Sequence, residues 1–222
     1  MSEIRPETPR SVYNEGCLAA HALDLLGERW SFLVIRELIF GPKRFGLLRA
    51  GLPGISASVL TQRLEGLQAA GIVRRRMLPD PAEVQVYELT EAGQAALPLL
   101  EAMCQWAVQV PGHDPTKFIS PSALMISMGA MTDAAKAAGM TVRAGFDLGR
   151  ETFSGGIEAG RWRARRGAAE GDIAFVGSAN ALAPVIYGPA PLCHWIDSGA
   201  IAFTGDPSLG QRFLDLFSLG PR

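Results

Sequence analysis

In the first part of the stretch from residue 16 to residue 107, several short segments with a helical pattern of apolar residues follow one another, and a break separates each from the next. Apolar residues at helical spacing mark the segments 18–26, 31–40, 43–50 and 56–67. The last two segments are separated only by Gly51-Leu52-Pro53-Gly54, a sequence rich in turn-forming residues. This order restricts the segment to a compact helical unit whose third and fourth helices are joined by a tight turn.

The pattern then changes from helical to extended. Residues 72–77 and 84–89 are predicted strands of a hairpin, and the Pro-Asp-Pro sequence at 79–81 predicts a longer tip than a two-residue turn. A last helix follows, in which Pro98 predicts a bend or a late start. Helix, helix, short helix, turn, helix, hairpin, helix is the order of a winged helix-turn-helix domain, which we assign to residues 16–110.

The distribution of charge favours nucleic acid as the partner of this domain. The whole chain has a formal net charge of -1, but residues 41–78 hold seven basic residues and one acidic residue, so this stretch carries 7 - 1 = +6. A run of like charges is more often a solvated face than a binding site. The position of the basic residues in the fold therefore decides between the two interpretations. The basic residues fall on the helix-turn-helix and on the first wing strand, which touch double-stranded DNA in this fold. The expected DNA contacts are Lys43, Arg44, Ser56, Ser58, Thr61, Gln62, Arg63, Arg74, Arg75 and Arg76.

Several short motifs resemble the HxlR family of winged-helix regulators. They are Gly-x-x-Trp at 27–30, Gly-x-x-Arg-Phe at 41–45, Gly-Ile-Ser at 54–56, Leu-Thr-x-Arg-Leu at 60–64 and Tyr-x-Leu-Thr-x-x-Gly at 87–93. The resemblance implies a DNA-binding transcriptional regulator, usually a repressor, that acts as a homodimer on a pseudo-palindromic operator. It also implies that the first and last helices of the domain form the dimer interface, through Leu18, Leu23, Leu100 and Trp106.

A cysteine near the start of the domain supports an alternative function. The family often opens with Cys-Pro, whereas here Cys17 is followed by Leu18. In some members such a cysteine senses oxidants or electrophiles, and a helix N-terminus can lower a thiol pKa. A small buried apolar role for Cys17 is the competing interpretation. Cys17, Cys104 and Cys193 are too far apart in sequence for a zinc motif, so no metal is expected.

The remaining residues, 111–222, carry ten basic and ten acidic residues and do not form a second DNA surface. Helical and extended patterns alternate there, including one helix over 122–138, strands over 141–148, 152–157 and 161–165, and a terminal helix from Pro207. The strand and Gly-Asp at 199–206 before that helix resemble the sterol carrier protein type 2 domain. The whole chain is therefore predicted to be α+β, a winged helix followed by a sterol-carrier-like α/β domain.

The second resemblance implies a hydrophobic small molecule held between sheet and helices, which would control DNA binding. The pocket candidates are Met125, Met128, Phe146, Phe175, Trp195 and Phe213. Methionines and aromatics at such spacing also fill ordinary cores. The rival interpretation is that this half is a lipid carrier or a structural module and that DNA binding is constitutive.

Other functional classes are disfavoured. Residues 1–15 form a polar arm without the apolar segment of a signal peptide, and no apolar run is long enough for a membrane span, so we expect a cytoplasmic protein. His194 and Asp197 have no nucleophile motif, phosphate loop or metal-ligand spacing beside them. We expect neither catalysis nor a cofactor.

Overall fold

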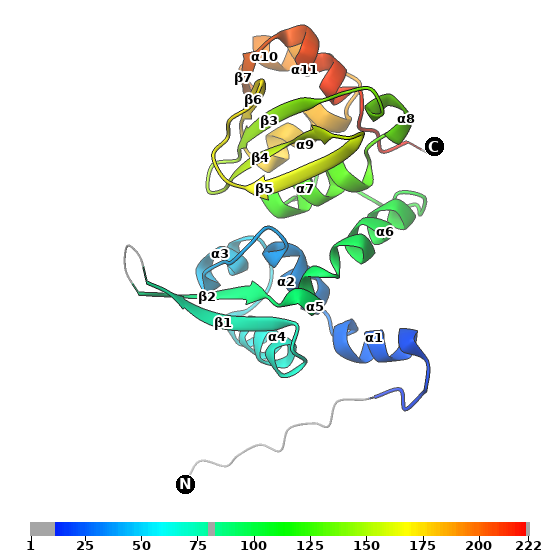
Figure 1. The fold of residues 1–222 in the computed structure, drawn as a ribbon, viewed down its shortest axis with the longest axis vertical. Coiled ribbons are helices and arrows are strands. Elements are labelled where there is room, and N and C mark those ends of the chain that lie inside the picture. The colour runs from blue at the N-terminus through cyan, green and yellow to red at the C-terminus, as the bar shows by residue number, and fades with distance from the viewer. Residues whose placement is uncertain (1–11, 80–82, 221–222) are drawn as a thin grey trace.

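The computed structural model describes residues 12–79 and 83–220, and it shows two domains, one above the other in Figure 1. Most of the predicted N-terminal arm and the hairpin tip at 80–82 lie outside the described residues. The N-terminal domain contains α1 (Leu18–Leu26), α2 (Ser31–Leu38), α3 (Phe45–Ala50), α4 (Ala57–Ala69), β1 (Val73–Leu78), β2 (Val84–Leu89), α5 (Glu91–Gln94) and α6 (Leu97–Ala107). The order is the predicted one, except that the single last helix expected after the hairpin is two helices, α5 and α6.

The core of the N-terminal domain lies between α2, α4 and the base of the wing. Val34, Ile35 and Leu38 of α2 meet Leu60 and Leu64 of α4, and all are buried. The wing is the antiparallel pair β1 and β2, with Lys43 bridging to Tyr87 as a short third strand. Pro98 marks a late helix start, because it stands in the first turn of α6, where its missing N–H costs no hydrogen bond.

The C-terminal domain is a five-stranded sheet with helices packed on one face. Its elements are α7 (Pro121–Ala130), α8 (Ala134–Ala137), β3 (Val142–Asp147), β4 (Thr152–Glu158), β5 (Arg161–Arg166), β6 (Ile173–Val176), α9 (Ala179–Tyr187), α10 (Leu192–Asp197), β7 (Ala202–Gly205) and α11 (Pro207–Leu214). The strand order is β5-β4-β3-β6-β7, in which only β3 and β6 run parallel. The β5–β6 connection crosses the outer face at Gly145, where a Cβ would lie 2.3 Å from the backbone of Ala169.

One local prediction for this domain is wrong. The helix expected over 122–138 is two helices, because Asp133 accepts hydrogen bonds from the N–H groups of Ala135 and Lys136 and so starts a new helix. The strand predicted over 161–165 is present as β5, which pairs with β4 and forms an edge of the sheet. None of the helices in the described part of the chain has the length and apolar character needed to cross a membrane.

The apolar residues predicted to line a ligand pocket form a filled core. The rings of Phe146 and Phe175 stack with centroids 5.5 Å apart, and Phe213 lies 6.4 Å from Phe146 and 6.1 Å from Phe175. Met125 and Met128 are fully buried in the same cluster, and the half-buried Trp195 packs against it. These side chains pack together in the space between sheet and helices. Among them, Met125 also borders a cavity of about 470 Å³, which lies toward α6 and β5.

The two domains share a tightly packed boundary, which is formed mainly by α7. Ile126 of α7 is buried in the core of the N-terminal domain. The ring of Phe40 meets that of Phe153 edge to face at 5.5 Å, and Gln105 of α6 donates a hydrogen bond to the carbonyl of Ala130. The boundary therefore combines apolar packing with specific polar contacts.

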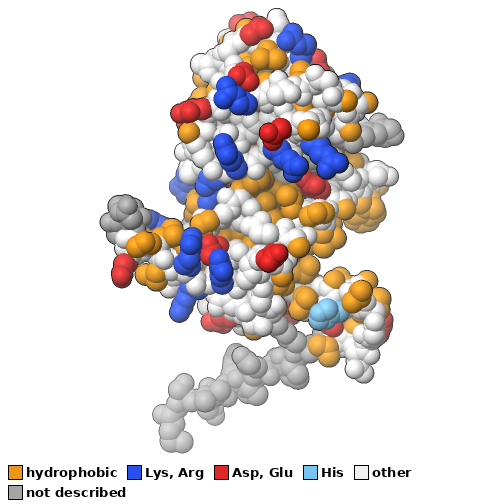
Figure 2. Space-filling model, in the orientation of Figure 1, with side chains coloured by type: hydrophobic (Ala, Val, Ile, Leu, Met, Phe, Trp, Pro, Cys, Tyr) orange, Lys and Arg blue, Asp and Glu red, His pale blue; other side chains and the backbone are white. Residues whose placement is uncertain are grey.

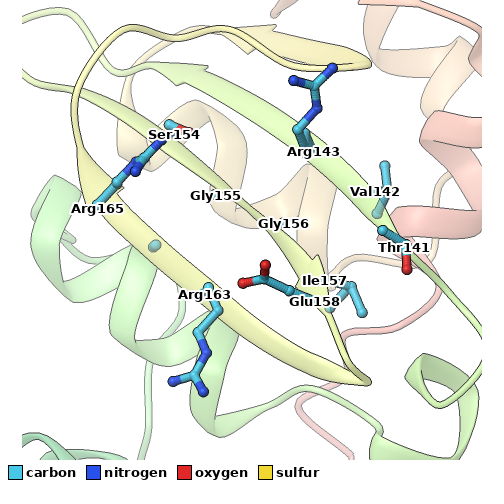
Figure 3. A pocket seen from close by; sticks show the side chains of 11 residues that line it. Thr141, Val142, Arg143, Ser154, Gly155, Gly156, Ile157, Glu158, Arg163 and Arg165 are labelled. Carbon is cyan, nitrogen blue, oxygen red and sulfur yellow. The ribbon is translucent and has the colours of Figure 1, made fainter.

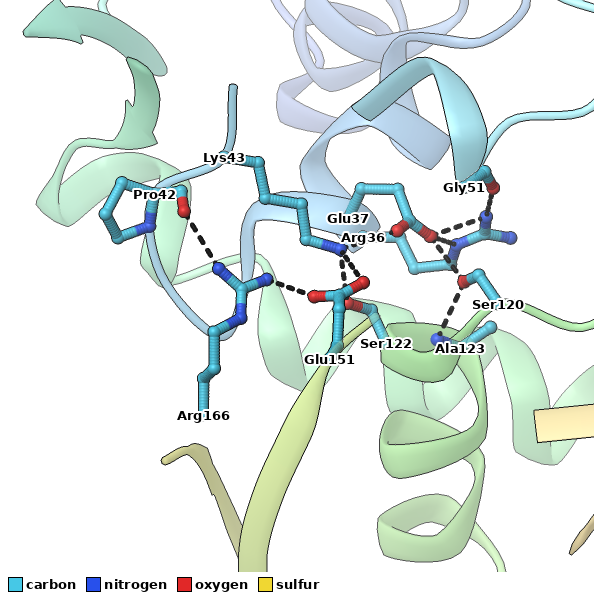
Figure 4. A network of polar contacts seen from close by, with 10 residues as sticks. All are labelled: Arg36, Glu37, Pro42, Lys43, Gly51, Ser120, Ser122, Ala123, Glu151 and Arg166. Carbon is cyan, nitrogen blue, oxygen red and sulfur yellow. Dashed lines mark hydrogen bonds and ion pairs between the residues drawn. The ribbon is translucent and has the colours of Figure 1, made fainter. Parts of the chain in front are cut away.

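An ionic cluster is buried at this boundary (Figure 4). The ammonium group of Lys43, whose side chain is 0% exposed, lies 2.9 Å from Glu37 Oε2 and 2.8 Å from Glu151 Oε1, and it donates to Ser122 Oγ at 3.0 Å. Arg166 pairs with the second oxygen of Glu151 and donates to the carbonyl of Pro42. Since Glu37, Lys43 and Pro42 belong to the winged helix and the others to the second domain, the cluster joins the two.

The cluster is closed on its other side by α2 and the turn before α4. Arg36 donates to Glu37 Oε1 and to the carbonyl of Gly51, and Ser120 Oγ donates to the same Glu37 oxygen at 2.5 Å. Gly51 is required there, since a Cβ would lie 2.3 Å from Glu37 Oε2. Both oxygens of each carboxylate are therefore used.

Replacement of Lys43 tests the contribution of the cluster to stability. Lys43→Met removes the cation that lies between the Glu37 and Glu151 carboxylates and leaves each with an arginine as its only charged partner, Arg36 or Arg166. Because one oxygen of each buried carboxylate loses its charged partner, we expect a loss of about 3–5 kcal/mol in the free energy of unfolding, measured in urea. Lys117→Met removes an exposed lysine and serves as the matched control. A loss of under about 1 kcal/mol for Lys43→Met would show that the buried charges are not mutually dependent.

Candidate nucleic-acid interface

The helix-turn-helix is made by α3, the turn 51–56 and α4. Ser56 caps α4 by accepting a hydrogen bond from the N–H of Val59 at 3.2 Å. Gly54 has φ of +89°, a backbone conformation that side-chain-bearing residues rarely adopt, and it lets the turn reverse within a few residues. Leu60, Leu64 and Leu67 anchor the inner side of α4, which fixes the direction of its outer face.

The outer face of α4 is polar and exposed. Ser58, Thr61 and Gln62 all lie on it, and their hydroxyl and amide groups are suited to phosphates and base edges in a major groove. Arg44, at the N-cap of α3, is exposed as well. Arg49 in the last turn of α3 is also exposed. It is one of the seven basic residues of 41–78, but it is not among the predicted DNA contacts.

The three wing arginines lie on two faces of the hairpin. Side chains alternate along a strand, so Arg74 and Arg76 share one face and Arg75 points to the other. Arg74 and Arg76 both pair with Glu88, at 2.6 Å and 3.2 Å. Arg75 makes no ion pair with any residue that the structure describes. Figure 2 shows basic side chains gathered over the wing, and Arg75 supplies uncompensated charge there.

Two of the predicted DNA contacts need correction. Lys43 is fully buried in the ionic cluster, so its ammonium group cannot reach a phosphate. The Arg63 side chain is only 19% exposed and pairs with Glu28 at 3.0 Å, which holds the guanidinium against the α1–α2 connection. The other eight predicted contacts, Arg44, Ser56, Ser58, Thr61, Gln62, Arg74, Arg75 and Arg76, are exposed.

A separate apolar surface covers α1 and α6, which both extend to the right of the winged helix in Figure 1. Leu18 is 85% exposed and Trp106 is 66% exposed, and Leu23, Leu99 and Met103 are also exposed. Leu100 is buried in the core of its own domain, so the expectation that it packs across a dimer interface is wrong. The reason is that α6 turns Leu100 inward and the neighbouring apolar residues outward.

Cys17 is exposed at the N-cap of α1. The backbone N–H groups of Ala20 and Ala19 stabilise the thiolate and lower the pKa of Cys17 below its usual value. Cys104 lies in α6 and is partly buried against the core of the N-terminal domain, and this burial raises the pKa of its thiol. The structure therefore removes the interpretation of Cys17 as a buried apolar residue.

A groove of about 460 Å³ lies on the outer face of the second sheet (Figure 3). Its floor is Gly156 in β4, and its sides carry Arg143, Arg163 and Arg165 from the two neighbouring strands. Arg143 pairs with Asp172 at 3.0 Å. The groove is basic, but it belongs to a different domain from the helix-turn-helix.

The geometry agrees with comparisons to known proteins. The family model described as HxlR-like helix-turn-helix matches residues 25–114. YvaP of Bacillus subtilis, an uncharacterized HTH-type transcriptional regulator, is 36% identical over 104 residues, which are 46% of this chain and 88% of YvaP. The HTH-type transcriptional regulator YodB of the same organism is 41% identical over 88 residues, 40% of this chain and 79% of YodB.

The chain belongs to the HxlR-like helix-turn-helix family. The structure of the reduced form of YodB aligns with a TM-score of 0.40 and 38% identity, covering 45% of this chain and all of that one. These relatives are transcriptional regulators and not enzymes, and this HxlR-family chain is a DNA-binding transcriptional regulator. The matches cover less than half of the chain, so the second domain is an addition to the part shared with them.

The wing provides a direct test of the DNA surface. Arg75→Ala removes one unpaired cation, so we expect affinity for a duplex selected by the purified protein from a random pool to fall by roughly threefold to tenfold, and the salt slope to fall by about 1. Fluorescence anisotropy across a salt series measures both. Arg165→Ala, which removes the same charge from the second domain, should leave both values unchanged. Equal effects of the two substitutions would indicate general electrostatics instead of a wing contact.

Proposed function

We propose that this regulator acts as a homodimeric repressor on a pseudo-palindromic operator, under the control of its second domain. The supporting observation is the placement of two surfaces on one domain. The polar face of α4 and the wing are exposed for DNA, while a separate apolar surface on α1 and α6 is exposed for a second copy. A two-fold dimer through that surface would present two copies of α4 to two half-sites.

The apolar surface supports the dimer on energetic grounds. Exposed leucine, methionine and tryptophan side chains on α1 and α6 are of the kind that soluble proteins cover with a partner. Tryptophan is also enriched among the residues that contribute most to interfaces. Figure 2 shows hydrophobic side chains over this part of the molecule.

Control by the second domain is supported by the boundary described above. Lys43 contacts Glu151 through its side chain and Tyr87 of the wing through its backbone. A change in the second domain that moves Glu151 therefore acts on the base of the wing. The filled core between sheet and helices does not support an apolar ligand in that position. Of the sterol-carrier resemblance, our proposal therefore keeps only the sheet with helices on one face and not the ligand.

Disruption of the apolar surface tests the dimer. Trp106→Glu places a charge in the centre of the proposed contact, so we expect monomers at micromolar concentration and weaker operator binding, measured by native mass spectrometry and anisotropy. Val176→Glu puts the same charge on an exposed apolar residue of the second sheet and is the matched control. A dimer that persists in Trp106→Glu would place the interface elsewhere.

A second candidate function, regulation by oxidants or electrophiles, is supported by the exposure and lowered pKa of Cys17. A thiolate attacks quinones and disulfides, and this one lies at the start of α1, inside the proposed dimer surface. Addition of a group there would alter the packing of α1 against a partner. The DNA surface itself is the same under both candidates.

The pH dependence of labelling tests this candidate. Because its pKa is lowered, Cys17 should remain thiolate as the pH falls below the usual thiol range, so iodoacetamide should label it faster than Cys104 at neutral pH. Peptide mass spectrometry gives both rates. If benzoquinone releases the operator from the wild type, Cys17→Ser should retain it. Equal release in both proteins would exclude a sensing role for Cys17.

A further inference from the structure

A cavity of about 370 Å³ opens at the seam between the two domains. Leu47 and Ala50 of α3 form the wall on the winged-helix side. The opposite wall comes from the β3–β4 turn at 148–151 and the start of α9 at 178–180, and the linker at 118–121 closes one side. The volume lies near the lower end of the range for small-molecule sites, which often occur at domain boundaries.

One part of this seam cavity is apolar. Leu47, Ile119 and Leu148 line it together with Phe118, an apolar residue that is 53% exposed. Asn180 holds the linker on both sides of Phe118, because it donates to the carbonyl of residue 117 and accepts from the N–H of Ile119. Phe118 is thus fixed at the cavity with its ring only half covered.

The other part of the cavity is positively charged. Arg150 lines it, is exposed and makes no ion pair with any residue in the described part of the chain. The adjacent Glu151 cannot neutralise Arg150, because its two carboxylate oxygens are bound by Lys43 and Arg166. The N-terminal end of the nine-residue helix α9, capped by Ser178, adds a positive dipole end to the same wall.

We propose that the seam cavity binds a small organic anion. Its apolar body packs on Phe118 and Leu148, and its carboxylate or phosphate pairs with Arg150. A planar guanidinium accommodates either headgroup through paired hydrogen bonds. The bound molecule touches α3 of the helix-turn-helix on one side and the turn that carries Glu151 on the other, so it acts on the boundary between the domains.

The regulatory part of this inference rests on the proposed function, but binding itself does not. Anilinonaphthalene sulfonate, an apolar fluorophore with one anionic group, serves as the probe on the full chain without DNA. We expect saturable binding that Arg150→Ala weakens at least tenfold and Phe118→Ala also weakens, since each removes one half of the site. Benzoate and phenyl phosphate as competitors identify which headgroup the site prefers.

Arg165→Ala is the matched control, since it removes an exposed arginine from the groove on the sheet. Probe affinity unchanged in Arg150→Ala, or lost in Arg165→Ala alone, would overturn the inference. Anisotropy with the selected duplex then separates the two proposals. If the protein binds the probe through Arg150 but the competitors do not change its affinity for DNA, the binding site stands and its regulatory role is excluded.

Discussion

The arrangement of this molecule depends on one buried ammonium group. Lys43 has lost all contact with water, and a buried cation is tolerated only where anions and hydrogen-bond acceptors surround it. The anions come from both domains, Glu37 from the winged helix and Glu151 from the second domain. Neither domain alone can satisfy the charge. The relative position of the domains is therefore fixed by electrostatics as well as by apolar packing.

The same residue connects the domain boundary to the DNA surface. The backbone of Lys43 pairs with Tyr87 in both directions, at 3.0 Å and 2.9 Å, so it belongs to the wing sheet. Its neighbour Arg44 caps α3 at the exposed surface. Lys43 thus connects the cluster to the wing through backbone hydrogen bonds and to the helix-turn-helix through its chain neighbour Arg44. Packed cores and ionic contacts of this kind have discrete arrangements, which makes them suitable for switching.

Local patterns predicted most of the fold, because helix and strand periodicity, caps and breakers act over a few residues. Ser56, Pro98 and the turn at 51–54 all behave as their local chemistry requires. Lys43 and Arg63 were misplaced because a count of charge does not reveal a partner, and the partners Glu151 and Glu28 are distant in sequence. One signal was present: Arg36 and Glu37 are the only charged residues of an otherwise mostly apolar helix, and a buried acid such as Glu37 needs cationic or hydrogen-bonding partners.

The position of Ile126 has a consequence for the independence of the two domains. A side chain from α7 of the second domain completes the core of the winged helix, together with the contact between Phe40 and Phe153. Cutting the chain after α6 would leave a cavity in the core of the DNA-binding half and would remove Glu151 from the buried Lys43. Each half therefore carries part of the interior of the other: Ile126 fills the core of the winged helix, and Phe40 packs against the core of the second domain.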